Sequence, residues 1–312
     1  MRFCCFVNPR SGGKRGELLI RRIQALSSSP HFTCDVVEID FRFLEQQIKN
    51  ALSYDRILIA GGDGTVSAFL PCLVASKLPI VLLPLGTGND LARELALLHI
   101  GTPSSPREWF SFYLSSPVKE VTVWMGKFES EPSPFYFINY LSFGYDGEVL
   151  CHFEVLRGRF SEISRIFGKH GNRFLYLIAG LQALFHPRLQ NLTLTSPQQG
   201  VVELPKLRSL LFSNIRSVMG IGVSHPDSSP FDTSLECSLL YRFSSYFGLV
   251  APFLRKFPLP IFSPTCCLGE QEWRIEGLPC PIWYQYDGEA QKLDHTSSLV
   301  LHPAGKVRIM CP

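Results

Sequence analysis

Residues 57–66, ILIAGGDGTV, decide the fold of this chain. Four apolar residues of strand character, 57–60, run directly into two glycines, an aspartate, a third glycine and a threonine. Glycine permits backbone geometries that a side chain forbids, so successive N–H groups can turn towards one anion. The start of a following helix adds its positive dipole end. The stretch therefore predicts a strand, a phosphate-binding turn and a helix, with Asp63 supplying an acid or a metal ligand.

Two more strands of the first half end in glycine-rich turns. The pattern predicts strands over 3–7 and 80–85, followed by NPRSGGK (8–14) and PLGTGND (84–90), each leading into a helix. Alternating strands and helices, with a further strand over 34–39, require parallel pairing in a layered α/β sheet. Ligands of such sheets bind beyond the carboxyl ends of the strands, so the three turns are expected to meet at one edge. The spacing of the first turn, 8–14, matches neither a P-loop nor a dinucleotide fingerprint.

The pattern changes after Pro117, where strand follows strand. Strands are expected over 118–128, 135–143, 189–195, 201–204, 207–215 and 235–243, with a helical insert near 160–184. Such a succession predicts an antiparallel β-sandwich. The 312 residues therefore divide into an α/β domain, 1–120, and a β-rich domain, 121–299.

Composition narrows the class of protein. A hydrophobic fraction of 46%, a charged fraction of 18% and a net charge of +3 describe a globular protein without the basic density of a nucleic-acid binder. The ten cysteines include no C-x-x-C, which argues against a zinc module and favours reduced thiols. The N-terminus begins a strand rather than a signal peptide, and no apolar run approaches the roughly 20 residues of a spanning helix. A cytoplasmic protein is expected.

Six short motifs occur along the chain, each of them once. They are NPRSGG (8–13), GGDGTV (61–66), PLGTGNDLAR (84–93), NYLSFGYD (139–146), FSNI (212–215) and QYDGE (285–289). With these motifs the chain resembles the diacylglycerol kinase family, within the wider group that holds sphingosine kinases and bacterial lipid kinases. The motif PLGTGNDLAR favours diacylglycerol kinases, because the first glycine motif of sphingosine kinases usually begins with serine.

The resemblance implies a fold and a reaction. It implies an N-terminal nucleotide-binding α/β domain with a parallel sheet, a C-terminal antiparallel β-sandwich, an active site in the cleft between them, and a return of residues 300–312 to the first domain. It also implies MgATP as the phosphoryl donor and a diacylglycerol hydroxyl as the acceptor, which would make phosphatidic acid in lipid signalling. The zinc-bearing modules of many animal relatives have no counterpart in the sequence.

Backbone N–H groups of the three turns are the expected contacts of the triphosphate. Hydroxyl, amide and ammonium side chains within the same motifs can add contacts to it. The predicted nucleotide-binding set is Asn8, Ser11, Gly12, Gly13, Lys14, Gly61, Gly62, Gly64, Thr65, Gly86, Thr87, Gly88 and Asn89. Thr65 and Asn89 have helix capping as an alternative role, and Asn89 or Asp90 can cap the helix over 91–98.

The acceptor hydroxyl must lose a proton, so a carboxylate is needed close to it. The candidates for catalysis are Asp63, Asp287 and Glu289; the resemblance assigns the base to Asp287 or Glu289 and Asp63 to the metal or the acceptor. A D-G-E sequence is also a common turn between strands. Asp232 and Asp146 are further candidates for a Mg2+ network.

Two alternatives stay open at this point. The acceptor can be another lipid (a sphingoid base or ceramide) or NAD, or the chain can be a nucleotide-binding regulator without turnover. Residues 243–262 combine phenylalanines with two cations, which is typical either of sandwich core and loop or of a surface that dips into lipid headgroups. The latter predicts peripheral membrane association.

Overall fold

A computed structural model describes residues 1–312 apart from 13–14, 25–32, 87, 99–107, 109–111, 113–114, 161–170, 172–173, 185–188, 220–221 and 252–261. The chain forms two compact units, Met1–Val123 with Ala304–Pro312, and Trp124–Pro303. Two strands, β5 (Val118–Phe128) and β18 (Leu299–Met310), pass from one unit into the other. Each unit is described by itself below.

The first unit is a parallel α/β sheet. Its strands are β1 (Arg2–Val7), β2 (Thr33–Glu38), β3 (Arg56–Gly61) and β4 (Ile80–Pro84). They lie in the order β2-β1-β3-β4, all parallel, and β18 pairs with β4 in parallel through Ile309 and Ile80. Strands β3 and β4 are buried almost throughout, which is typical of a sheet covered on both faces.

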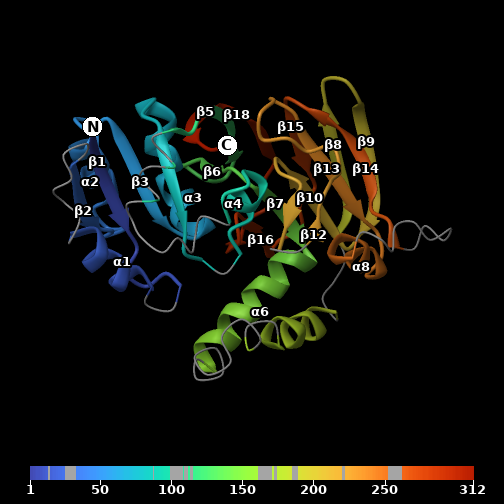
Figure 1. Ribbon diagram of the computed structural model, residues 1–312. Helices are drawn as coiled ribbons and strands as arrows, with labels where there is room; N and C mark the ends of the chain where they lie inside the picture. Colours follow the sequence, from blue (N-terminus) through green and yellow to red (C-terminus); the bar gives the residue numbers. More distant parts are fainter. Residues whose placement is uncertain are drawn as a thin grey trace. The chain divides into compact units, whose positions relative to one another are not determined.

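Three helices connect these strands, and a fourth, α4, follows β4 (Figure 1). They are α1 (Arg15–Gln24), α2 (Leu44–Ala51), α3 (Asp63–Ser76) and α4 (Asp90–Glu94). Helix α1 buries Leu19, Ile20 and Ile23, which share one face at helical spacing. Helix α3 is anchored by Phe69, whose ring meets that of Phe6 on β1 edge to face at 5.1 Å. The predicted α/β architecture is confirmed.

The second unit is an antiparallel sandwich, as predicted. Its strands are β6 (Phe135–Phe137), β7 (Tyr140–Gly144), β8 (Leu189–Ser196), β9 (Gly200–Leu207), β10 (Ser209–Ser213), β11 (Ser217–Val218), β12 (Gly222–Val223), β13 (Leu235–Leu240), β14 (Thr265–Glu270), β15 (Trp273–Glu276), β16 (Ile282–Tyr286) and β17 (Glu289–Leu293). One sheet runs β14-β13-β10-β7-β16-β17, and the other side is formed by β18-β15-β8-β9. A single core joins the two, with Phe143 and Phe212 from the first sheet and Trp273 and Leu299 from the second.

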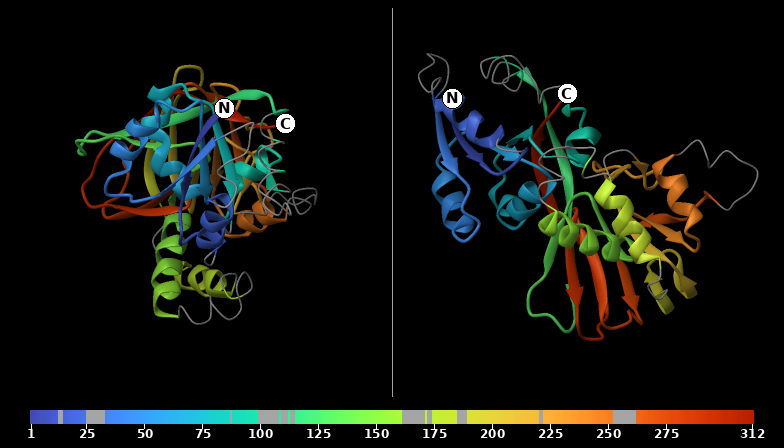
Figure 2. Two further views of the ribbon diagram at one scale, coloured as in Figure 1. Left: turned by 60° about the vertical axis from the view of Figure 1, so that its left-hand side comes forward. Right: turned by 90° about the horizontal axis from the view of Figure 1, so that it is seen from below.

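Two helices accompany this sandwich, α6 (Tyr145–Arg159) and α8 (Ser244–Val250), together with helical residues 174–183. Figures 1 and 2 show α6 in green and residues 174–183 in yellow-green side by side, extending away from the strands of their unit. Among the residues that the structure describes, no helix is both long and apolar enough to cross a bilayer.

Some sequence-based expectations for this unit are wrong in detail. The expected continuous strand over 135–143 is broken at 138–139, because the backbone there turns its N–H groups towards the Asp287 carboxylate. Helix α6 begins immediately after β7 although no helix is expected before residue 160, and the strand expected over 235–243 ends at Leu240. The strands β14 to β17 were not foreseen.

Candidate active site

The three glycine-rich turns of the first unit follow adjacent parallel strands. Val7 is in register with Ala60, and Gly61 with Pro84, so β1, β3 and β4 end at the same edge of the sheet. The Asn8 side chain donates a hydrogen bond to the Thr65 hydroxyl over 3.1 Å. This bond ties the first turn to the start of α3, which follows the second turn.

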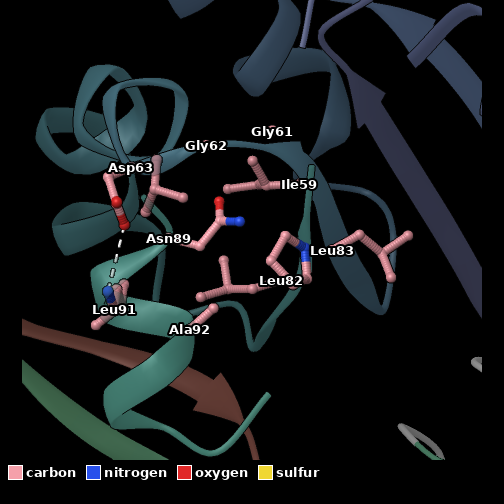
Figure 3. Close-up of a pocket in the computed structure, with 11 residues that line it drawn as sticks. Ile59, Gly61, Gly62, Asp63, Leu82, Leu83, Asn89, Leu91 and Ala92 are labelled. Carbon is pink, nitrogen blue, oxygen red and sulfur yellow. Dashed lines mark hydrogen bonds between the residues drawn. The ribbon is translucent and has the colours of Figure 1, made fainter. Parts of the chain in front are cut away.

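The second and third turns pack backbone against backbone. A Cβ placed on Gly86 would lie 2.6 Å from the Gly62 Cα and 2.7 Å from the Asn89 amide oxygen. A Cβ on Gly61 would lie 2.5 Å from the Thr65 side chain. In Figure 3 the Asn89 amide lies in the middle of a small pocket that both turns line. The glycines are therefore needed for close approach as well as for aiming N–H groups.

We expect Gly86→Ala to lower the free energy of unfolding by about 1–3 kcal/mol, because the methyl group has backbone on one side and Asn89 on the other. Affinity for a nucleotide, the ligand predicted from the sequence, should fall with it, since the two turns must separate. Thermal unfolding and nucleotide titration measure the two effects.

Gly158→Ala is the matched control, because a Cβ at that helical position meets nothing within 4 Å. It should leave nucleotide affinity unchanged and stabilise the protein by roughly 0.5–1 kcal/mol. Equal behaviour of the two variants would contradict the close packing of the turns.

Arg15 supports the first turn and was missed from the sequence. Its guanidinium donates to the Gly12 carbonyl and to the Leu85 carbonyl, each over 3.1 Å, and so bridges the first and third turns. Gly12 has a φ of +63°, which favours glycine. An arginine directly after a glycine-lysine turn is the signal that could have identified it. Gly13, Lys14 and Thr87 of the predicted set lie outside the described residues.

Asp63 holds the start of α4. Its carboxylate accepts hydrogen bonds from the N–H groups of Asp90 (2.9 Å) and Leu91 (3.3 Å), and Figure 3 shows the bond to Leu91. Asn89 stands at the N-cap position of this helix, but its side chain makes no capping hydrogen bond: at positive φ, it donates its amide to the Gly86 carbonyl instead. Asp63 brings a carboxylate to the glycine turns and fixes two of them together.

In the second unit, Asp287 is buried and bonded to the backbone. Its carboxylate accepts hydrogen bonds from the N–H groups of Ile138 (3.0 Å), Asn139 (2.8 Å) and Tyr140 (3.2 Å). In return, its own N–H donates to the Tyr140 carbonyl over 3.0 Å. These contacts give hydrogen-bond partners to the backbone N–H groups at the break between β6 and β7, so Asp287 has a clear structural role.

Glu289, two residues further on, is exposed at the start of β17. Surrounding protein raises the pKa of its carboxyl, the negative charge of Glu154 on α6 raises it further, and Arg157 opposes the shift. The side chain thus combines access to solvent with increased basicity. These are the properties that a general base requires.

Asp146 lies buried in the first turn of α6. Burial raises the pKa of this carboxyl from 3.8 to about 7, against hydrogen bonds from Tyr246 and Ser142 that favour the ionised form. One of its oxygens, Oδ1, has no hydrogen-bond partner. Ser142 in turn accepts a hydrogen bond from Gln285 (2.8 Å), whose Oε1 accepts one from the Gly288 N–H (3.0 Å). A buried polar chain therefore runs from Asp146 to the turn at 287–289.

We expect Asp146→Asn to stabilise the protein at about pH 8 by on the order of 1–3 kcal/mol, and not at about pH 4. A folded-state pKa above the unfolded value means that the unfolded chain releases its proton first as the pH rises. The wild type should therefore lose stability between 3.8 and about 7, whereas the variant should not. Chemical denaturation across this range measures the difference. If the stability of both proteins changed with pH in the same way, the raised pKa of Asp146 would be contradicted.

The two metal candidates do not form a ready cation site. Asp232 accepts the N–H of Ser234 over 2.9 Å and, with burial, helps to raise the pKa of nearby Glu236 to about 7. Within the described part of the chain, no three His, Cys, Asp or Glu side chains gather as a metal site. A Mg2+ ion that also binds substrate phosphates needs only one or two carboxylates, so Asp63, at the glycine turns, fits such a site better than Asp232 or Asp146.

Solved structures define the class of fold. A diacylglycerol kinase structure from Bacillus anthracis str. Sterne has a TM-score of 0.64 and 16% identity, covering 100% of this chain and 97% of that one. Yeast NADH kinase complexed with NADH has a TM-score of 0.55 and 12% identity, covering 100% and 84%. The fold is thus the two-domain fold found in these kinases.

Sequence comparisons define the family. The family model of the diacylglycerol kinase catalytic domain matches residues 2–124, and that of the accessory domain matches residues 136–228. The chain belongs to the diacylglycerol kinase family.

Diacylglycerol kinase theta of Mus musculus is 29% identical over 246 residues, 69% of this chain and 25% of that protein. The Homo sapiens protein of the same name is 30% identical over 240 residues, 68% and 24%. The matched region thus spans about a quarter of these relatives' length.

Proposed function

We propose that this chain is a lipid kinase that transfers the γ-phosphate of ATP to the hydroxyl of diacylglycerol and so produces phosphatidic acid. The observation that carries the proposal is the junction of three glycine-rich turns at the carboxyl edge of β1, β3 and β4, in a chain matched by both the catalytic and the accessory models of the family. The first unit would bind ATP, and the second would bind the lipid.

The turns would hold the triphosphate through backbone N–H groups of the glycines in all three motifs. The Thr65 hydroxyl and the side chains of Asn8, Ser11, Lys14 and Asn89 are the proposed further contacts. Asp63 would contribute a carboxylate to Mg2+, which neutralises charge on the transferring phosphate when bound. The same carboxylate accepts the N–H groups of Asp90 and Leu91, which hold it at the glycine turns.

The general base is proposed to be Glu289. Asp287 is bonded to three backbone N–H groups and serves the turn, whereas Glu289 is exposed and has a raised pKa. The acceptor hydroxyl oxygen would form its bond to the γ-phosphorus as the bond to the β-phosphate oxygen breaks. The hydroxyl proton would pass to the Glu289 carboxylate, and ADP would leave. Because the acceptor is a lipid, the proposal includes a cytoplasmic enzyme that works at a membrane surface.

The test is transfer of labelled phosphate from MgATP to diacylglycerol, sphingosine, ceramide and NAD, each offered separately. Labelled phosphatidic acid from the wild type, and none after Asp63→Asn, supports the proposal. Label on a sphingoid base, ceramide or NAD would replace the acceptor and refute the diacylglycerol assignment. ATP binding with no transfer to any acceptor would refute the kinase itself in favour of a nucleotide-binding regulator.

A further inference from the structure

Gln285 is a buried amide on β16 that the proposed reaction does not use. It is 5% exposed, and both ends of its side chain are hydrogen-bonded. Its Oε1 accepts the N–H of Gly288 over 3.0 Å, and its Nε2 donates to the Ser142 hydroxyl over 2.8 Å. The first bond reaches the tip of the hairpin formed by β16 and β17, and the second reaches β7, the neighbouring strand. Gln285 therefore ties the tip of this hairpin to the interior of the sheet.

The tip of the hairpin is a two-residue turn, Asp287 and Gly288. Tyr286 and Glu289 are in register on either side of it. Both turn residues have positive φ, +49° and +84°, which is the pattern of a type I′ turn. The hydrogen bond that closes such a turn uses the N–H of Glu289, so the N–H of Gly288 needs another acceptor. Gln285 supplies that acceptor.

Gln285 and Glu289 lie on opposite faces of the sheet. Side chains alternate along a strand, and residues opposite one another on paired strands share a face. Gln285 shares its face with its partners Ser142 and Ala290, and Ala290 packs against the apolar cluster of α6. Glu289 shares the other face with Tyr286. Gln285 thus holds the turn from which Glu289 emerges without itself facing a substrate of Glu289.

Asp146 fixes the direction in which the Gln285 amide points. An amide can rotate to exchange its oxygen and its NH2 group, and only one orientation gives Gly288 an acceptor. The Ser142 hydroxyl donates its single proton to the Asp146 carboxylate, so it presents only lone pairs to Gln285. The NH2 group must then face Ser142, and Oε1 faces Gly288.

Tyr246 on α8 is a second donor to the Asp146 carboxylate. Its side chain is buried, and its hydroxyl also bonds to that of Ser209. Tyr246 belongs to the segment 243–262 considered above for lipid contact, of which residues 252–261 lie outside the described part. The described start of that segment therefore serves this buried chain of polar groups.

We propose that Gln285 is a positioning residue for the base Glu289: it holds the N–H of Gly288 and so keeps the turn in the geometry that presents the Glu289 carboxylate to the acceptor hydroxyl. This inference rests on the proposed function, in which Glu289 takes the hydroxyl proton. Asp287 anchors the first residue of the turn, and Gln285 anchors the second. A base acts only within hydrogen-bond reach of the proton that it takes, so a looser turn lowers its contribution.

The experiment replaces Gln285 by Met in the full chain, which keeps the length of the side chain but removes the amide. Gln291→Met, on the other strand of the same hairpin, is the matched control, because the Gln291 side chain is hydrogen-bonded to none of the described residues. Kinetics are measured at pH 8, where Asp146 is ionised. Gln285→Met should lower kcat by about 10–100-fold with KM for MgATP within about twofold, and the control should keep both values.

Combination with Glu289→Gln separates positioning from a general structural role. If Gln285 acts through Glu289, Gln285→Met should lower kcat by less than about twofold once Glu289 is replaced, because no base is left to misplace. An equal loss in both backgrounds, or wild-type kcat in Gln285→Met, would overturn the inference. Ser142→Ala is the second variant, since it leaves Gln285 in place but removes the group that orients its amide. It should lower kcat several-fold, and again only while Glu289 is present.

Failure of the proposed function remains distinguishable. Hydrogen exchange at the Gly288 amide, followed by NMR, reports on the turn without catalysis. It should be at least about tenfold faster in Gln285→Met than in the wild type, and unaltered in Gln291→Met. If the wild type phosphorylates no lipid, the proposed function falls, but the exchange still decides whether Gln285 holds the turn. Faster exchange with unaltered kcat would overturn the positioning role and leave the kinase proposal intact.

Discussion

Replacement of Glu289 by Gln is expected to lower kcat for phosphoryl transfer by about 10²–10⁴-fold, the usual contribution of a positioned base. The amide keeps the size of the side chain but cannot take the proton of the acceptor hydroxyl. Because Glu289 is exposed, the free energy of unfolding should change by less than about 0.5 kcal/mol. Steady-state kinetics with saturating MgATP and thermal unfolding measure the two effects.

The pH dependence of the wild type gives a second measure of the same residue. A base acts only when it is deprotonated, and the pKa of Glu289 is raised by the surrounding protein and by Glu154. Activity should therefore fall as the pH drops through that raised value, above the 4.5 of an ordinary glutamate. In Glu289→Gln the residual activity should lose this acid limb.

Glu154→Gln is the matched variant, because it removes a charge that raises the pKa of Glu289 without touching the acceptor. The acid limb should move to lower pH while kcat on the plateau stays close to the wild type. Arg157 has the opposite influence, so Arg157→Gln should move the limb to higher pH. A limb that moves in neither variant, or a fully active Glu289→Gln, would exclude Glu289 as the base.

The sequence predicted the parts of this site that depend on local chemistry. A strand followed by several glycines has few alternative structures. The ends of the strands expected over 3–7, 57–60 and 80–85 were therefore foreseen to within one residue. Their meeting at one edge follows from parallel pairing, which the alternation of strands and helices requires. The register of Gly61 with Pro84 confirms that these two turns are neighbours.

Side-chain partners far apart in the sequence could not be foreseen. Asp63 caps a helix that begins 27 residues later, and nothing in GGDGTV indicates that its partners are the N–H groups of Asp90 and Leu91. The break in the strand expected over 135–143 depends on Asp287, whose carboxylate binds those N–H groups from 148 and 149 residues away. The local sequence pattern predicts a continuous strand there, and the tertiary contact with Asp287 interrupts it.

The second large effect is expected for Asp287→Asn, which should lower the free energy of unfolding by about 3 kcal/mol. The buried carboxylate accepts three backbone N–H groups, from Ile138, Asn139 and Tyr140. An amide has one oxygen in place of two, and its NH2 group would face a backbone donor. At least one buried N–H would therefore lose its partner. Chemical denaturation, followed by the fluorescence of the buried tryptophans of this unit, measures the loss.

Asp287→Asn tests the effect of the carboxylate alone, without a change in backbone strain. Asp287 has a φ of +49°, a conformation that asparagine adopts about as readily as aspartate, so strain of the turn is not added. Glu289→Gln, on the same hairpin, is the control for a nearby change of charge. If Asp287 is structural, Asp287→Asn should lose stability and retain more kcat than Glu289→Gln at a temperature where it is folded. If Asp287→Asn instead kept native stability and lost all kcat, Asp287 would be the general base. Only a residue at the reacting atoms can stop transfer without loosening the hairpin.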